Sequence, residues 1–233
     1  MNKVVCITYF YRIDAREENM DIPNRFKILA KNIPMHIFCS TKDKEIFEEI
    51  PNTTVHCKEL ESFEIYKLLH ENATELPKVR NMKKDIFNYM CIMNCKVECL
   101  KIIKKKVYAD HYVWIDAGIS KLLHNPDPVF ENFYRNLLHN TLSKKLVIPG
   151  ILEPNNDLEY LTTAVHWRFC GGLFLIPSNL IELFYKVSIM AIKDIAKKTN
   201  KAIWEVNMWA YIEHLLPIEW RPARFDESIF NVC

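Results

Sequence analysis

Short apolar runs and amphipathic stretches alternate along the first half of the chain. Residues 3–10 are mostly β-branched or aromatic and predict a strand. A polar loop and a helix at 25–32 follow, then a second strand at 34–40, a helix at 41–50 and a third strand at 52–60. Strands that alternate with helices are typical of a parallel sheet with crossover helices.

The second half of the chain continues this alternation. Apolar residues recur at spacings of three and four between Val79 and Lys105, which predicts one long helix. This helix leads into a strand that ends at Asp116. The sequence therefore predicts a single α/β domain over residues 1–233, with a mostly parallel central sheet flanked by helices. The remaining predicted elements are strands at 145–151 and 169–177 and helices at 129–138, 179–197 and 204–216.

Composition narrows the class of protein. A hydrophobic content of 49% and a charged content of 26% are typical of a soluble globular protein. The net charge of +2 produces no strong field, so we expect no nucleic-acid partner. No apolar run approaches the ~20 residues of a membrane span, and the start of the chain does not read as a signal peptide. The eight cysteines have no Cys-x-x-Cys spacing, which predicts free thiols in a reducing, cytoplasmic compartment.

The apolar run before Asp116 stops at that carboxylate, and Ala117 and Gly118 follow it. The chain has only four glycines, and glycine is needed where backbone turns sharply or approaches something closely. Ligands of open α/β sheets bind outside the carboxyl ends of the strands. We therefore expect Asp116 to face a ligand, either a divalent cation or a ribose hydroxyl. A turn-forming aspartate would give the same pattern.

A basic cluster that includes Arg80 and Lys83 opens the predicted long helix. Cations at the start of a helix oppose its macrodipole. An anionic ligand bound there would remove the conflict, because helix N-termini attract phosphate. A solvated basic cluster explains the same residues without a ligand.

Glu205 lies in the first turn of a predicted helix and shares a face with the apolar residues Met208 and Trp209. A buried carboxylate without a partner is costly. Glu205 therefore caps the helix, pairs with an arginine such as Arg168 or Arg221, or lines a pocket as a base or as an acceptor for a sugar hydroxyl.

His166 precedes the glycine pair Gly171 and Gly172, which comes before an apolar strand. A histidine and an aromatic neighbour at the mouth of a pocket would suit the face of a sugar. Ordinary packing of His166 beside Trp167 is the alternative.

The chain has no Walker loop and no G-x-G-x-x-G, G-x-S-x-G or H-E-x-x-H motif. The order of its motifs instead resembles small nucleotide-sugar-dependent glycosyltransferases of the GT-A fold, most closely the bacterial HtrL/YibB-like group. The matching stretches cover nearly the whole chain, and YVWIDAGIS is the most specific. The others are VVCITYFYRIDAR, RNMKKDIFNYM, RFCGGLFLIP, WEVNMWAYIE and FDESIF.

The resemblance implies a hexosyltransferase-type enzyme of glycan biosynthesis. It would move a sugar from a UDP- or GDP-sugar to a hydroxyl of a glycan or another acceptor. Residues 1–118 would bind the nucleotide, and residues 119–233 the sugar and acceptor. The resemblance places Thr8, Tyr9 and Arg12 near the nucleotide and Lys83 near the phosphates. It also places Gly171 and Gly172 on the sugar or acceptor side, and Glu205 near the reacting carbon.

One departure from the family concerns the metal. GT-A enzymes usually carry Asp-x-Asp, which holds Mn²⁺ or Mg²⁺ on the diphosphate, whereas Gly118 occupies the third position here. Either Asp116 binds the metal together with water, or Arg80, Lys83 and Lys84 neutralise the leaving group without a metal.

The stereochemical course stays open. If the reaction inverts configuration, Glu205 is the first candidate for the general base and Asp226 the second. If it retains configuration, Glu205 holds the sugar. Two alternatives to a glycosyltransferase are a catalytically degenerate nucleotide-sugar-binding protein and an α/β interaction module without catalysis.

Overall fold

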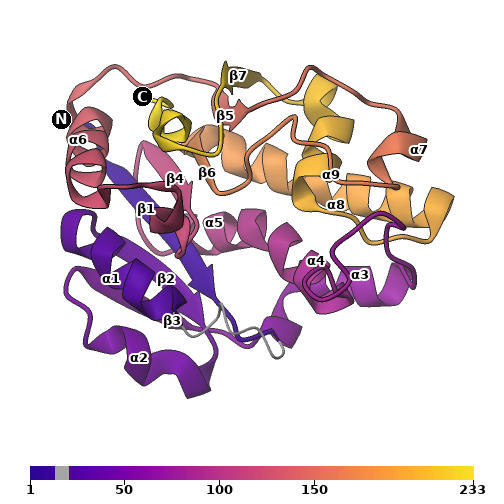
Figure 1. Cartoon of the computed structure of the whole chain (residues 1–233), viewed down its shortest axis with the longest axis horizontal. Helices are drawn as coiled ribbons and strands as arrows, with labels where there is room; N and C mark the ends of the chain where they lie inside the picture. The colour runs from indigo at the N-terminus through magenta and orange to yellow at the C-terminus, as the bar shows by residue number, and fades with distance from the viewer. Residues whose placement is uncertain (14–20) are drawn as a thin grey trace.

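The computed structural model describes residues 1–13 and 21–233, and in this part of the chain seven strands form one sheet. The strand order is β3-β2-β1-β4-β6-β5-β7. Figure 1 shows the sheet with helices on both of its sides. The strands are β1 Val4–Phe10, β2 Met35–Cys39, β3 Thr53–Cys57, β4 His111–Ile115, β5 Leu146–Gly150, β6 Leu173–Pro177 and β7 Ile218–Pro222.

The sheet is mostly parallel, as the sequence predicts, and β6 is the exception. It runs antiparallel to both of its neighbours, β4 and β5. Its first residue, Leu173, therefore lies opposite Ile115, the last residue of β4. The segment that enters β6 thus meets the carboxyl end of β4, where Asp116 lies. This contact positions the candidate site.

Alternate side chains of the central strands enter two different cores, as expected for strands covered on both faces. In β4, Tyr112 and Trp114 pack on one face, and Val113 and Ile115 pack on the other. The first face is covered by α3, α4, α5, α8 and α9, and the second by α1, α2 and α6 (Figure 1). The helices are α1 Ile22–Asn32, α2 Lys44–Glu48, α3 Glu64–Asn72, α4 Phe87–Asn94, α5 Lys96–Lys104, α6 Pro126–His139, α7 Leu158–Leu161, α8 Ile181–Thr199 and α9 Glu205–Ile212.

The prediction of one helix from Val79 to Lys105 is wrong. Helix α4 begins only at Phe87, and the helix is interrupted at Cys95 before α5 begins. The segment before α4 folds into turns because two polar side chains bind its backbone. The side chain of Asn81 accepts hydrogen bonds from the amides of residues 83 and 84, and that of Asp85 accepts one from the Asn81 amide. Such local bonds compete with a helix. The basic cluster at 80–84 consequently lies at no helix N-terminus.

Three elements of the structure have no counterpart in the sequence-based assignment. These are α3, the short helix α7 and the edge strand β7. Strand β7 pairs in parallel with β5 and is only half-buried, so its sequence shows no continuous apolar run. The expected division at residue 118 falls just after β4, inside a continuous sheet.

Two histidines on the neighbouring strands β2 and β3 predict a pH dependence of stability. The rings of His36 and His56 stack, and their nitrogens share a hydrogen bond of 2.9 Å. Burial lowers the pKa of both, and proximity to His36 helps to bring the pKa of His56 to about 4. The unfolded chain therefore binds more protons than the folded chain between pH 4 and about 6.5, and stability falls as the pH falls through that window.

We expect His56→Gln to reduce this loss of stability, measured by urea unfolding at pH 7 and pH 4.5. His124→Gln is the matched control, because His124 is exposed, and it should retain the wild-type difference. Equal pH dependence in all three proteins would contradict the prediction.

Candidate functional site

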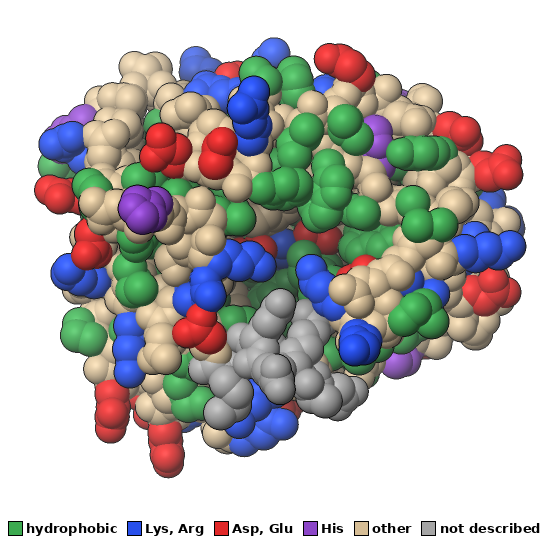
Figure 2. All heavy atoms as spheres, viewed as in Figure 1, with side chains coloured by type: hydrophobic (Ala, Val, Ile, Leu, Met, Phe, Trp, Pro, Cys, Tyr) green, Lys and Arg blue, Asp and Glu red, His purple; other side chains and the backbone are tan. Residues whose placement is uncertain are grey.

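A cavity of about 660 Å³ opens where β1 and β4 end and the chain enters β6. This volume lies within the range of small-molecule sites. Figure 2 shows the hollow on one face of the molecule, with basic side chains at its rim and acidic side chains visible inside. The wall combines residues from β1, α4, the turn after β4, the segment before β6, the start of α9 and the segment after β7.

Asp116 lies on the wall of this cavity, as its position after β4 predicts. Its amide donates a 2.8 Å hydrogen bond to the carbonyl of Gly172, which joins the end of β4 to the entry of β6. Its Oδ1 accepts a 2.7 Å bond from the indole Nε1 of Trp114. The side chain remains 36% exposed, so the carboxylate is accessible to a ligand.

Lys96, the first residue of α5, is completely buried beneath the cavity. Its Nζ lies 2.7 Å from the Gly171 carbonyl, 2.9 Å from Oε1 of Glu205 and 3.2 Å from Oδ1 of Asp116. Burial lowers the pKa of this lysine, but the two carboxylates more than offset burial and the net pKa is raised. Lys96 is therefore charged and links both carboxylates.

Glu205 is 1% exposed and is the first residue of α9. Burial raises the pKa of this carboxyl, and the nearby ammonium of Lys96 opposes the shift. The positive end of the α9 dipole also favours the anion. Glu205 lines the cavity, and its charged partner is Lys96. The two candidate arginines pair elsewhere, Arg168 with Glu213 and Arg221 with Glu219.

Two glycines leave space for these carboxylates. A Cβ on Gly171 would lie 2.3 Å from Oε1 of Glu205 and 2.9 Å from Cγ1 of Val206. A Cβ on Gly172 would lie 3.4 Å from Oδ2 of Asp116, which is ordinary contact. Gly171 is thus required for the close approach of the loop to Glu205.

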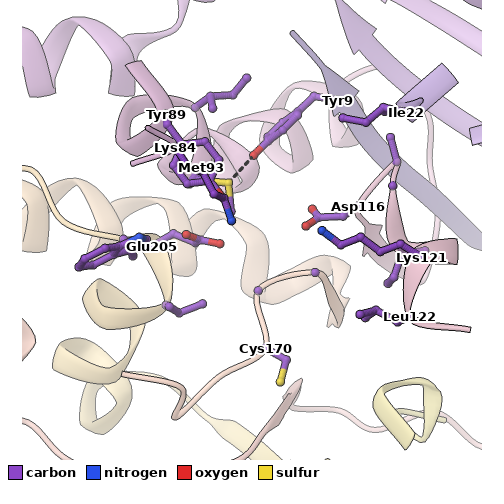
Figure 3. Close-up of a pocket in the computed structure, with 18 of the residues that line it drawn as sticks. Tyr9, Ile22, Lys84, Tyr89, Met93, Asp116, Lys121, Leu122, Cys170 and Glu205 are labelled. Carbon is purple, nitrogen blue, oxygen red and sulfur yellow. Dashed lines mark hydrogen bonds between the residues drawn. The ribbon is translucent and has the colours of Figure 1, made fainter. Parts of the chain in front are cut away.

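The structure brings about half of the predicted site residues to one cavity. The hydroxyl of Tyr9 reaches across it and donates to the sulfur of Met93 at 3.2 Å (Figure 3). The predicted residues that line the cavity are Tyr9, Asp116, Ala117, Gly118, Gly171, Gly172 and Glu205.

Four residues predicted to bind the nucleotide or phosphates lie outside the lining. Thr8 is fully buried in β1, and Arg12 pairs with Asp43 at 2.8 Å. Arg80 donates to the carbonyls of residues 77 and 85. Lys83 is exposed, and it is the neighbouring Lys84 that lines the cavity.

Two further predicted residues have structural partners away from the cavity. His166 is buried, its amide donates to Asn207, and its ring contacts Tyr160 edge to face. The packing alternative therefore describes His166. Asp226 accepts hydrogen bonds from Ser228 and caps the short 3-10 helix Glu227–Phe230.

Several residues of the site were not identified from the sequence. Lys96 had a signal, because it lies three residues after Met93 and four before Leu100, both on the apolar stripe. A lysine at a core-facing position needs a partner. The other residues had no local signal, because the fold alone brings them together. They are the cations Arg25 and Lys121 and the aromatic residue Phe225. Lys84 and Trp167, which the sequence analysis names as candidates, also line the cavity.

The described residues do not fit a divalent cation well. No group of three or more His, Cys, Asp or Glu side chains there is arranged to hold a metal. Oδ1 of Asp116 already contacts an indole and an ammonium, which leaves one carboxylate oxygen for an ion. The positive charge of Lys96, 3.2 Å from this carboxylate, also disfavours a second cation.

Comparison with known proteins defines the fold. No protein-family model and no curated protein matches the chain. Among 184 solved chains that match, a structure of CMP:2-keto-3-deoxy-manno-octonic acid synthetase complexed with CTP covers 95% of this chain and 90% of its own. The TM-score is 0.51 and the sequence identity 6%. The chain therefore shares its α/β fold with this synthetase, while the resemblance to the HtrL/YibB-like group stays a prediction. Within the described residues no helix is long and apolar enough to cross a membrane.

The two glycines allow a matched test of the site geometry. Gly171→Ala should destabilise the protein by about 1–3 kcal/mol, because the new methyl group overlaps the Glu205 carboxylate. Gly172→Ala should have a smaller effect, because its Cβ meets only ordinary contacts. The free energy of unfolding from urea denaturation measures both. A Gly171→Ala variant as stable as Gly172→Ala would contradict this geometry.

Proposed function

We propose that this protein is a glycosyltransferase that moves a sugar from a nucleoside-diphosphate sugar to a hydroxyl acceptor. The observation that carries the proposal is the pair of carboxylates, Asp116 and Glu205, held by one ammonium at the wall of a ligand-sized cavity. The cavity lies at the carboxyl ends of β1 and β4, where ligands of open α/β sheets bind. The similar fold of a synthetase complexed with CTP supports a nucleotide in this cavity.

Cationic side chains around the cavity suit a diphosphate. Arg25, Lys84 and Lys121 come from three separate segments and all contribute to the lining. In Figure 3 the amine of Lys121 points toward Asp116, and Lys84 lies on the opposite side of the cavity. During transfer the bond between the sugar carbon and the diphosphate oxygen breaks, and the nucleoside diphosphate leaves as an anion. These cations would stabilise the charge on that leaving group.

Glu205 is the proposed acid–base or sugar-binding carboxylate. The new bond forms between the acceptor oxygen and the sugar carbon, and the hydroxyl proton must pass to a base. Burial raises the pKa of Glu205, which makes its carboxylate a stronger base than an exposed one. In a retaining reaction the same carboxylate would hold a sugar hydroxyl. Asp226 drops out of the proposal because its carboxylate is used in a cap.

An aromatic pair on the C-terminal side suits the acceptor. The rings of Trp167 and Phe225 meet edge to face, with centroids 4.8 Å apart, and both line the cavity. Phe225 is 46% exposed, so its ring is accessible. Aromatic rings present apolar faces on which the C–H face of a sugar ring can lie. We therefore place the acceptor on this side, and the nucleotide on the side of Tyr9.

The direct test measures binding and turnover of UDP- and GDP-sugars by thermal shift and by release of the nucleoside diphosphate. We expect wild type to bind at least one of them, and Asp116→Asn to bind it roughly ten- to a hundredfold more weakly, because a charged hydrogen bond is lost. Asp226→Asn is the matched control, and it should retain wild-type turnover because Asp226 lies off the cavity.

The same assay separates the alternatives. Binding without release of nucleoside diphosphate would favour a degenerate binding protein. Formation of pyrophosphate from CTP and a free sugar would favour nucleotidyl transfer. Absence of binding to any nucleotide would overturn the proposal in favour of an interaction module. Parallel reactions with Mn²⁺, Mg²⁺ or EDTA test the metal, and we expect turnover to persist in EDTA because cationic side chains face the diphosphate.

A second variant tests the placement of the phosphates. Lys121→Met should weaken binding of UDP or GDP by roughly tenfold, because a charge-assisted hydrogen bond to phosphate is lost. Lys83→Met removes an equal charge from an exposed position outside the cavity and should leave affinity unchanged. Isothermal titration calorimetry at fixed salt measures both, and equal affinities in the two variants would place the diphosphate elsewhere.

A further inference from the structure

We propose that Lys96 is a positioning residue whose buried ammonium acts as a built-in cation between Asp116 and Glu205, fixing how the two carboxylates face the cavity. The effect of Lys96 on binding of the donor sugar rests on the proposed function. The arrangement of the three side chains is independent of the proposed function.

The three contacts of Lys96 use all the donors of the group. An ammonium has three N–H bonds and accepts none. Here the three acceptors are the Gly171 carbonyl, Oε1 of Glu205 and Oδ1 of Asp116. They come from three parts of the chain, namely the entry to β6, the start of α9 and the end of β4. One side chain thus sets the relative placement of the segments that build the cavity.

Lys96 also determines which oxygen of Asp116 meets a ligand. Oδ1 is engaged by both Lys96 and the indole of Trp114. Within the described residues Oδ2 has no hydrogen bond, and it lies beside Gly172 on the cavity wall. The carboxylate therefore presents one oriented oxygen, which suits a single hydroxyl group better than chelation of an ion.

Stability alone does not account for a lysine at this position. Replacing a buried ion network by apolar residues is often neutral or stabilising, whereas removing only one partner leaves a buried charge uncompensated. Lys96 has no exposed surface and lies 5.6 Å from the centre of the Trp114 ring, among apolar residues. A methionine would fit such a space. The role that remains for the lysine is to position the two carboxylates.

The first experiment tests whether a divalent metal ion can take the place of the Lys96 ammonium. Lys96→Met should leave two adjacent carboxylates without a counter-charge, and these should then bind an added divalent cation. We expect MnCl₂ or MgCl₂ to raise the Tm of Lys96→Met by about 3–6 °C at ten times the dissociation constant. Wild type should show no such rise. Neither should Lys105→Met, the matched control, which removes an exposed lysine at the end of α5.

The double variant Lys96→Met/Glu205→Gln keeps the proposal testable even where Lys96→Met alone does not fold. It removes the ammonium and the buried carboxylate together, so of the three charges that of the partly exposed Asp116 remains. It should unfold at a higher temperature than Lys96→Met in metal-free buffer, and it should lose the response to metal. A purely structural role of Lys96 would give no metal response in any variant. That result, or a double variant less stable than Lys96→Met, would overturn the proposal.

The second experiment concerns the sugar. Lys96→Met should retain binding of UDP or GDP within about twofold, because Lys84 and Lys121 remain, but it should lose the additional affinity of the matching nucleotide sugar. Retention of that additional affinity would overturn the positioning role. If wild type binds no nucleotide sugar, the proposed function fails, while the metal response of Lys96→Met still tests the placement of Lys96.

Discussion

The buried ammonium of Lys96 is the interaction on which the site depends. It neutralises one of two carboxylates in a region where an unpaired charge would be costly, and it bonds the loop backbone at Gly171. The pairing works only because Gly171 has no side chain, since a Cβ there would overlap Glu205. The lysine, the glycine and the two acids therefore form one unit, in which each residue limits what the others can be.

The fold explains how residues so distant in sequence meet. Strand β6 runs against its neighbours, so its entry meets the carboxyl end of β4 instead of lying at the far edge of the sheet. The Asp116 amide bonds the Gly172 carbonyl at this junction. Helix α9 then directs its N-terminus, with Glu205 as its first residue, at the same point. A fully parallel strand at this position would bring its own carboxyl end beside Asp116, and the glycine pair would lie at the opposite edge.

Local patterns predicted the parts of this arrangement that depend on local chemistry. The strand before Asp116 was identifiable from its apolar run, and Glu205 from its position on an apolar helix face. The basic cluster at 80–84 was misassigned because the side chains of Asn81 and Asp85 bind the backbone and prevent a helix. Arg25 and Lys121 could not be found, because their place on the cavity depends on how separate segments pack. The periodicity of a sequence carries no information on such contacts between distant segments.

The cavity is surrounded by charged groups of both signs. The buried unit of Lys96, Asp116 and Glu205 carries one excess negative charge, whereas Lys84 and Lys121 contribute positive charge to the lining. An anionic diphosphate is attracted by these lysines and repelled by the acids, and the amine of Lys121, which points toward Asp116 (Figure 3), offsets part of that repulsion. Hydroxyl groups carry no such penalty and can donate to the carboxylates. A nucleotide sugar carries both a diphosphate and hydroxyl groups, so its two parts suit the two kinds of side chain. The bond between these parts would then lie near Lys121 and Asp116, where a cation and a carboxylate face each other (Figure 3).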